Sequence, residues 1–81
     1  MSREIYRIYY YVDLSGREHR LRCDLLTEPE GYGVAIWDEG GDREEILSLT
    51  PSRDRAEELL ELLARNQVTP CALRDVVEDW L

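Results

Sequence analysis

This sequence of 81 residues contains no lysine, a single histidine and two cysteines. Its ten basic residues are therefore all arginines, against eighteen aspartates and glutamates, and the formal net charge is −8 at pH 7. A surface with this excess of negative charge repels phosphate backbones, which disfavours direct binding of nucleic acid. The same charge suits a basic protein partner, and it also serves solubility alone.

Long apolar runs are absent too. No stretch approaches the roughly 20 consecutive apolar residues of a membrane-spanning helix, and the first residues, MSREIYR, lack the apolar core of a secretory signal. We therefore expect a cytoplasmic protein with no membrane contact. The two cysteines, Cys23 and Cys71, lie far apart and outside any C-x-x-C pair, so we expect both to be reduced.

Metal ligands and catalytic groups are equally scarce. His19 precedes Cys23 by four residues on an expected strand, which places them roughly 13 Å apart, too far to share an ion within one chain. Cys71 falls in the first turn of an expected helix, where the helix dipole favours a thiolate, but no histidine is expected beside it as a base. We expect no metal, no cofactor and no enzymatic activity; an enzyme that uses Cys71 is a minor alternative.

What the sequence does contain is four segments typical of strands. They span residues 4–14, 17–27, 32–38 and 44–49, and glycine-containing turns separate them at residues 15–16, 28–31 and 40–41. In the third segment Tyr32, Val34 and Ile36 are expected to face inward. In the fourth, Leu47 and Leu49 are expected to do so.

The first two strands have a predicted register. If Ser15-Gly16 forms a two-residue turn, residues whose numbers sum to 31 face each other. One face then pairs Val12 with His19, Tyr10 with Leu21, Ile8 with Cys23 and Tyr6 with Leu25. The other face pairs Tyr11 with Arg20, Tyr9 with Arg22 and Arg7 with Asp24. This sorting predicts an apolar face in the core and a polar face in solvent.

Residues 50–81 predict two helices, which begin at Thr50-Pro51 and Thr69-Pro70. Apolar residues recur at helical spacing in both. In the first helix they are Ala56, Leu59, Leu60 and Leu63, with Leu62 at the edge; in the second they are Leu73, Val76, Val77, Trp80 and Leu81. Asn66 is the expected end of the first helix.

We therefore expect a single α+β domain over residues 1–81. A four-stranded antiparallel meander in the order 1-2-3-4, residues 1–49, carries a layer of two helices, residues 50–81, on one face.

The C-terminal run NQVTPCALRDVVEDWL, residues 66–81, resembles the ending of a family of small bacterial proteins of unknown function, found mainly in Firmicutes. The residues that match are Tyr9 to Tyr11, Tyr32-Gly33-Val34, Val68-Thr69-Pro70 and Asp75 to Leu81. Cys71-Ala72 departs from the larger or more polar residues expected after the proline. No activity is attached to this family, so the resemblance implies a fold and a class rather than a function.

Two candidate interaction surfaces follow from these predictions. The first is the outer face of the sheet, where the predicted register gathers Arg7, Tyr9, Tyr11, Arg20, Arg22 and Trp37. Aromatic residues and arginine are enriched at interface hot spots, although on a wet strand face they also shield one another. The second is the acidic side of the helices, with Asp54, Glu57, Glu58, Glu61, Asp75, Glu78 and Asp79. Solvated carboxylates explain that side equally well.

The expected function is a non-enzymatic interaction or regulatory module that binds a protein partner, or a second copy of itself, through the first surface. The alternative is an acidic inhibitor that imitates nucleic acid, as a phage-borne antagonist of a DNA-binding protein does, through the second surface.

Overall fold

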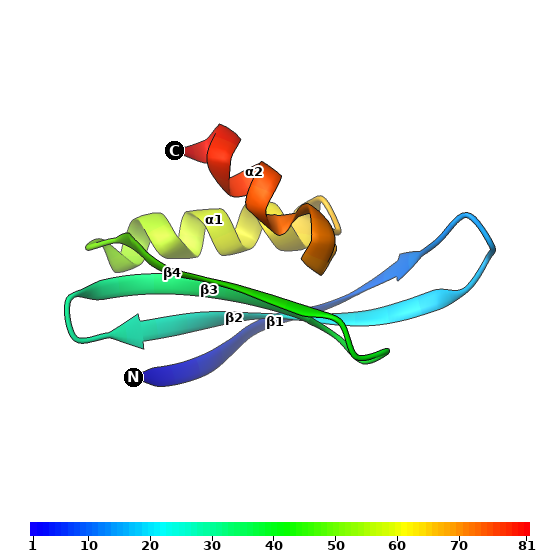
Figure 1. Ribbon diagram of the computed structural model, residues 1–81, viewed down its shortest axis with the longest axis horizontal. Helices are drawn as coiled ribbons and strands as arrows, with labels where there is room; N and C mark the ends of the chain where they lie inside the picture. Colours follow the sequence, from blue (N-terminus) through cyan, green and yellow to red (C-terminus); the bar gives the residue numbers. More distant parts are fainter.

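The structure is a computed structural model that describes residues 1–81. The strands are β1 (Ser2–Val12), β2 (Glu18–Glu28), β3 (Gly31–Asp38) and β4 (Arg43–Thr50); the helices are α1 (Arg53–Arg65), the 3-10 turn η1 (Pro70–Ala72) and α2 (Leu73–Trp80). The strands form one antiparallel sheet in the order 1-2-3-4, and both helices lie on the same side of it (Figure 1). The predicted α+β fold is thus confirmed. Neither helix has the length and apolar character needed to cross a membrane.

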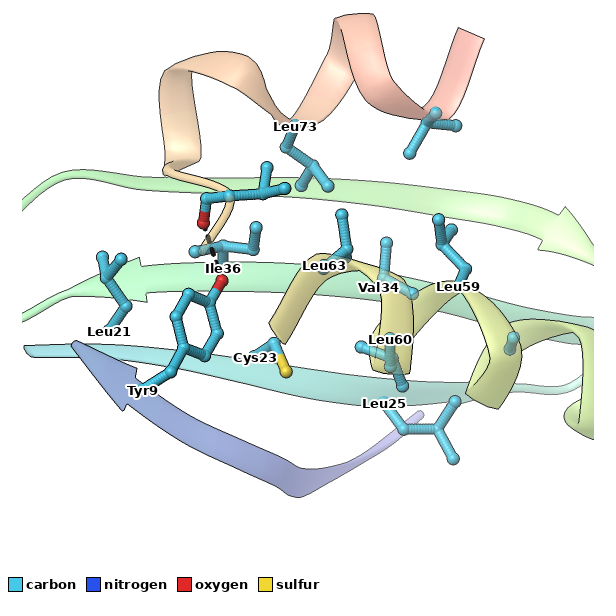
Figure 2. Packing of buried hydrophobic residues seen from close by; sticks show 13 residues of the cluster. Tyr9, Leu21, Cys23, Leu25, Val34, Ile36, Leu59, Leu60, Leu63 and Leu73 are labelled. Carbon is cyan, nitrogen blue, oxygen red and sulfur yellow. Dashed lines mark hydrogen bonds between the residues drawn. The ribbon is translucent and has the colours of Figure 1, made fainter. Parts of the chain in front are cut away.

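The core lies between α1 and the sheet (Figure 2). The predicted stripe of α1 is confirmed, because Ala56, Leu59, Leu60 and Leu63 are all fully buried. The residues that meet this stripe from the sheet and from α2 are Leu21, Cys23, Leu25, Val34, Ile36, Leu73 and Val77. Leu81 was expected inward, but it follows the last helical residue and is 73% exposed.

The helix starts differ from the prediction. The cap of α1 is Ser52, whose side chain accepts from the amide of Arg55 at 3.2 Å, while Thr50 accepts from the amide of Ser52 at 3.1 Å. At the second start Pro70 opens a separate 3-10 turn rather than the helix itself, which begins at Leu73, and the Thr69 hydroxyl caps no amide. A serine two residues after a threonine offers an equally good cap, and the sequence alone did not separate them.

The end of α1 is the predicted one. Asn66 is the cap residue, and its amide donates to the carbonyls of the last turn. The next residue, Gln67, takes the left-handed conformation with φ 52°. This turn leads into Val68, which is buried in the core.

The turn between β1 and β2 has three residues rather than the predicted two. The Asp13 amide donates to the Arg17 carbonyl at 3.0 Å, and the Gly16 amide donates to the Asp13 carbonyl at 2.9 Å. Gly16 has φ 86°, the left-handed conformation that closes a loop of this kind. From Arg7 to Val12, each residue of β1 therefore faces the residue of β2 whose number brings their sum to 30. Tyr9, for example, faces Leu21.

This one-residue shift exchanges the two faces of β1, so the predicted pairs are wrong. Tyr9 lies on the helix side, where its hydroxyl donates to the Val68 carbonyl at 2.7 Å (Figure 2). Tyr11 also packs against the core, whereas Ile8 and Tyr10 lie on the other face, opposite Arg22 and Arg20. A second irregularity, between Ile5 and Arg7, directs both Tyr6 and Arg7 towards Glu61 of α1 at 3.0 Å.

β4 is also irregular. Val34 faces Ile46 while Tyr32 faces Thr50, so β4 carries two extra residues between those pairs. Glu28 anchors the irregularity by accepting from the Ser48 amide at 2.7 Å. As a result Leu47 is 50% exposed, contrary to the prediction, while Leu49 packs against the core as expected.

Candidate interaction surface

The face of the sheet opposite the helices, here called the open face, is built around Trp37. Its register partners are Arg22 on β2 and Arg43 on β4. Each of these guanidinium groups lies 5.0 Å from the centroid of the indole, and that of Arg3 lies 5.5 Å away. A guanidinium at this distance is attracted to the face of the ring. Arginines from β1, β2 and β4 thus surround one aromatic side chain on β3.

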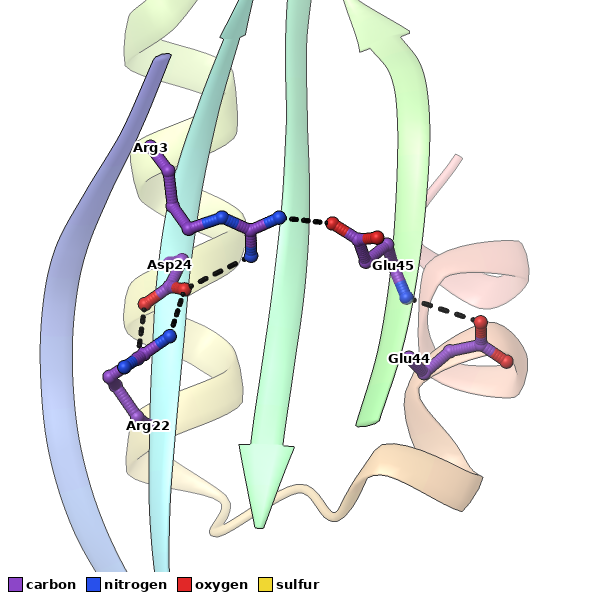
Figure 3. Close-up of polar contacts among 5 residues, drawn as sticks. All are labelled: Arg3, Arg22, Asp24, Glu44 and Glu45. Atoms are coloured by element: carbon purple, nitrogen blue, oxygen red, sulfur yellow. Dashed lines mark hydrogen bonds and ion pairs between the residues drawn. The ribbon is translucent and has the colours of Figure 1, made fainter. Parts of the chain in front are cut away.

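A buried carboxylate lies beneath these arginines. Asp24 is fully buried and accepts from Nε and Nη2 of Arg22, both at 2.9 Å, and from Nη1 of Arg3 at 3.3 Å (Figure 3). Arg3 also reaches Glu45 on β4. It crosses β3 at Ala35, which faces both acids in register and is small enough to leave room for the guanidinium. The network ties β1, β2 and β4 together on the open face.

Three of the six residues predicted for this face lie on it, namely Arg20, Arg22 and Trp37. The predicted contact of Arg22 with Trp37 is present. Arg7, Tyr9 and Tyr11 lie on the helix side, because the longer turn shifts the register of β1.

The prediction missed Arg3 and Arg43. The predicted turn at residues 40–41 would place Glu44 opposite Trp37, whereas the three-residue loop 39–41 of the structure places Arg43 there. Arg3 reaches across two strands, and no register rule predicts such a contact.

Apolar side chains extend along β1 on the same face. Ile5, Ile8, Tyr10 and Val12 are between 44% and 60% exposed. Ile5 and Ile8 share with Trp37 a cavity of about 230 Å³. Its lining residues are Ile5, Ile8, Arg20, Leu21, Arg22, Trp37, Asp38 and Glu39. An apolar strip bordered by arginines is a feature that monomeric proteins use for contacts with partners.

The acidic side of the helices is partly neutralised by the chain's own arginines. Glu57 pairs with Arg53 at 2.7 Å and Glu61 pairs with Arg7 at 3.0 Å. Glu58 lies 3.7 Å from Arg55. The remaining acids of the predicted set are exposed and make no ion pair: Asp54, Asp75, Glu78 and Asp79. Four uncompensated carboxylates are thus distributed over two helices.

A third polar feature, which the sequence did not reveal, lies at the far end of the sheet. The Nε2 atom of His19 lies 2.9 Å from Asp13 in the first turn, and its Nδ1 atom lies 2.9 Å from Asp38 at the end of β3. Tyr11 packs beside the imidazole, with ring centroids 5.5 Å apart. Both nitrogens can donate only when the ring is protonated. A protonated ring can therefore donate to both carboxylates and connect the first hairpin to β3.

Comparison with known proteins gives a family but no activity. A family model described as "Family of unknown function (DUF6514)" matches residues 1–81. The chain belongs to this family. Neither a curated protein nor a solved structure gives a match.

The thiols of this DUF6514 chain are both free. Cys23 is buried in the core, and desolvation raises the pKa of its thiol to about 11. Cys71 is exposed, and its sulfur lies 3.4 Å from the Thr69 hydroxyl. No cluster of three His, Cys, Asp or Glu side chains in the DUF6514 chain is placed to hold a metal ion.

The histidine contact makes a pH-dependent contribution to the stability of this DUF6514 chain. The bonds to Asp13 and then Asp38 raise the pKa of His19, and the bonds from Ser15 and then His19 hold the pKa of Asp13 far below its ordinary value. A raised histidine pKa stabilises the fold fully below the unfolded value of 6.5 and loses this effect as pH rises through the folded value. A lowered aspartate pKa stabilises above 3.8 and loses its effect as pH falls.

We expect His19→Gln to lower the melting temperature most between these two values, and progressively less as the pH rises above 6.5. Thermal melts of both proteins from pH 4 to 9 measure the difference. Glu18→Gln, which changes the preceding exposed residue, should follow the wild type above pH 5. A constant difference between His19→Gln and wild type at all pH values would contradict the double hydrogen bond.

Proposed function

We propose that this protein is a non-enzymatic interaction or regulatory module that binds a protein partner through the open face of the sheet. The observation that carries the proposal is the asymmetry of the sheet. Helices bury one face, while the other displays Trp37 among three arginines beside exposed Ile5 and Ile8. Trp and Arg are the side chains most enriched at binding hot spots.

The chemistry of this face favours a partner with both apolar and acidic groups. Arg43 lies over Trp37 and makes no ion pair within the chain, so it is available to an acidic group of a partner. Ile5, Ile8 and the indole line the cavity into which an apolar side chain fits. The free energy gained by burying such an aromatic side chain is not weakened by physiological salt. The attraction between exposed charges, in contrast, is screened beyond about 8 Å.

We expect Trp37→Ala to weaken binding of the partner by at least about 30-fold, the factor that corresponds to the ~2 kcal/mol of a hot spot. The partner is first isolated by affinity capture and then titrated with each variant at low and high salt. Trp80→Ala is the matched control, because Trp80 on the helix side is also covered by an arginine, with Arg55 4.6 Å from its centroid. It should bind as the wild type does.

The acidic, nucleic-acid-mimicking inhibitor is the second candidate, and the four unpaired carboxylates of the helices favour it. It predicts that affinity falls steeply with salt and that DNA competes for the partner. Arginine in place of Asp75, Glu78 and Asp79 should then abolish binding while Trp37→Ala has no effect. That combination of results would show that the partner binds the acidic side of the helices and not the open face.

We further propose that the protein acts in the bacterial cytoplasm. Two free thiols, one of them exposed, suit a reducing compartment.

A further inference from the structure

β1 is one edge of the sheet, and it is the less protected edge. The other edge, β4, has eight residues, of which Arg43, Glu44 and Glu45 are charged, and it is interrupted near Ser48. β1 has eleven residues, and its charged residues and its one irregularity all lie at or before Arg7, so residues 8–12 are uncharged and regular. Edge strands without charges, proline or interruptions readily pair with another strand.

The backbone groups that face this edge can be identified. The Tyr10 carbonyl points away from β2, because it accepts from Nε2 of Gln67 at 2.7 Å. The Asp13 amide points towards β2, since it donates to Arg17. Backbone groups alternate sides along a strand, so those of Ile8, Tyr10 and Val12 face the free edge. Their side chains are the exposed ones on the open face.

The regular part of this edge is self-complementary. The irregularity at Tyr6 bounds it on one side and the turn that starts at Leu14 bounds it on the other, which leaves residues 7–13 with Tyr10 at the centre. When two copies pair antiparallel with Tyr10 at the centre, all seven residues find a partner. When the centre moves to Tyr9 or Tyr11, only five residues do. The pairs in this register are Arg7 with Asp13, Ile8 with Val12, Tyr9 with Tyr11 and Tyr10 with itself.

We propose that two copies of this chain pair through β1 in this register and form a continuous eight-stranded antiparallel sheet around a two-fold axis at Tyr10. Residues with edge-facing backbone groups then meet one another, as hydrogen bonding requires. Apolar side chains meet on the open face, and Arg7 faces the oppositely charged Asp13 on the helix side. The Gln67 side chain gives up the Tyr10 carbonyl to a backbone amide of the other copy.

Charge also favours β1 as the contact between two copies. Each chain carries a net −8, so most ways of joining two copies bring acidic surfaces together. Residues 2–12 contain Arg3, Arg7 and Glu4, a net charge of +1. The hairpin that β1 forms with β2 also extends past the helix layer (Figure 1), which leaves its end accessible. A junction of seven residues is short, so we expect a weak dimer.

Disulfide trapping tests the register. Tyr10→Cys is made together with Cys71→Ala, since Cys71 is the exposed native thiol. Residues in a hydrogen-bonded antiparallel pair have Cα atoms about 5.5 Å apart, which a disulfide spans. We expect mild oxidation to link this variant into covalent dimers. Ile8→Cys in the same background is the control: it is similarly exposed, but its counterpart lies roughly 13 Å away, beyond the reach of a disulfide.

Sedimentation velocity over a range of concentrations tests the edge itself. Val12→Pro removes an amide that faces the free edge and leaves the β1–β2 hydrogen bonds in place. Two hydrogen bonds are lost in a symmetric dimer, so we expect dimerisation to weaken at least about tenfold. Val12→Thr keeps the amide and should dimerise as the wild type does.

Three results would overturn the proposal. A wild type that stays monomeric while Tyr10→Cys forms no covalent dimer excludes the second copy. Faster linking of Ile8→Cys than of Tyr10→Cys refutes the register, and equal dimerisation of Val12→Pro and wild type refutes the edge. Trp37→Ala should leave the dimer intact, because Trp37 lies on β3. Loss of partner binding and loss of the dimer are therefore separate outcomes.

Discussion

Leu60→Ala is expected to leave little folded protein. Leu60 is fully buried at the centre of the contact between α1 and the sheet (Figure 2). Truncation of a buried leucine costs about 2–5 kcal/mol, because transfer energy is lost and a cavity remains. At 0.05–0.15 kcal/mol per residue, a chain of this length has a total stability of about 4–12 kcal/mol. The variant therefore loses a large part of the stability of the whole domain.

Urea denaturation measured by circular dichroism gives the size of this loss. Leu62→Ala is the matched control, since Leu62 lies two positions along the same helix and is only half-buried at the edge of the stripe. It should cost clearly less than Leu60→Ala. Equal denaturation midpoints for the two variants would show that the packing of α1 on the sheet does not depend on this face.

The helix layer was predictable because its signal is redundant. Four positions of α1 repeat at the 3.6-residue period, and an error of two residues at the N-cap leaves that pattern unchanged. Pro70 and Asn66 then fix the connection between the helices. The number and order of the strands were equally robust, since each turn contains glycine.

The register of β1 was not robust, because it depends on a single turn. An alternative signal was present in the sequence. Asp13 and Gly16 enclose two residues, as do Asp38 and Gly41 in the turn between β3 and β4, and both turns have the same pair of backbone hydrogen bonds. In both, the first aspartate accepts from the amide two residues later. An Asp-x-x-Gly sequence therefore predicts a three-residue loop here.

The incorrect register is nevertheless self-consistent, because tyrosine suits either face of a strand. Tyr9 is buried with its hydroxyl bonded to Val68, while Tyr10 is half exposed. Neither position on its own distinguishes the two registers. Half of the predicted site survived, since Arg20, Arg22 and Trp37 lie on β2 and β3, whose pairing does not depend on the first turn.

The buried Asp24 was beyond sequence reasoning. Apolar and polar residues alternate along this strand, so the pattern predicts that an aspartate between Cys23 and Leu25 faces solvent. It is buried because Arg22 and Arg3 lie over it, and the small Ala35 leaves room for Arg3 to continue across β3 to Glu45. The arginines that surround Trp37 thus also neutralise a buried charge, so the open face has a structural role as well as the proposed binding role.

Arg22→Met is expected to cost about 3 kcal/mol, because removal of one partner from a buried ion pair leaves an uncompensated charge. Methionine keeps the apolar stem against Trp37 but removes both 2.9 Å hydrogen bonds to Asp24. Arg3 remains at 3.3 Å, which places the loss at the lower end of the usual 3–5 kcal/mol.

Arg20→Met is the control, since Arg20 lies on the same strand and face but pairs with the exposed Glu39. Such a surface pair contributes about 0–1 kcal/mol. The double variant Arg22→Met with Asp24→Leu should recover part of the stability, because no unpaired charge remains in the sheet. Urea denaturation of the four proteins, wild type included, gives these differences. If Arg22→Met costs no more than Arg20→Met, Asp24 does not depend on Arg22, and the cluster around Trp37 is free to serve binding alone.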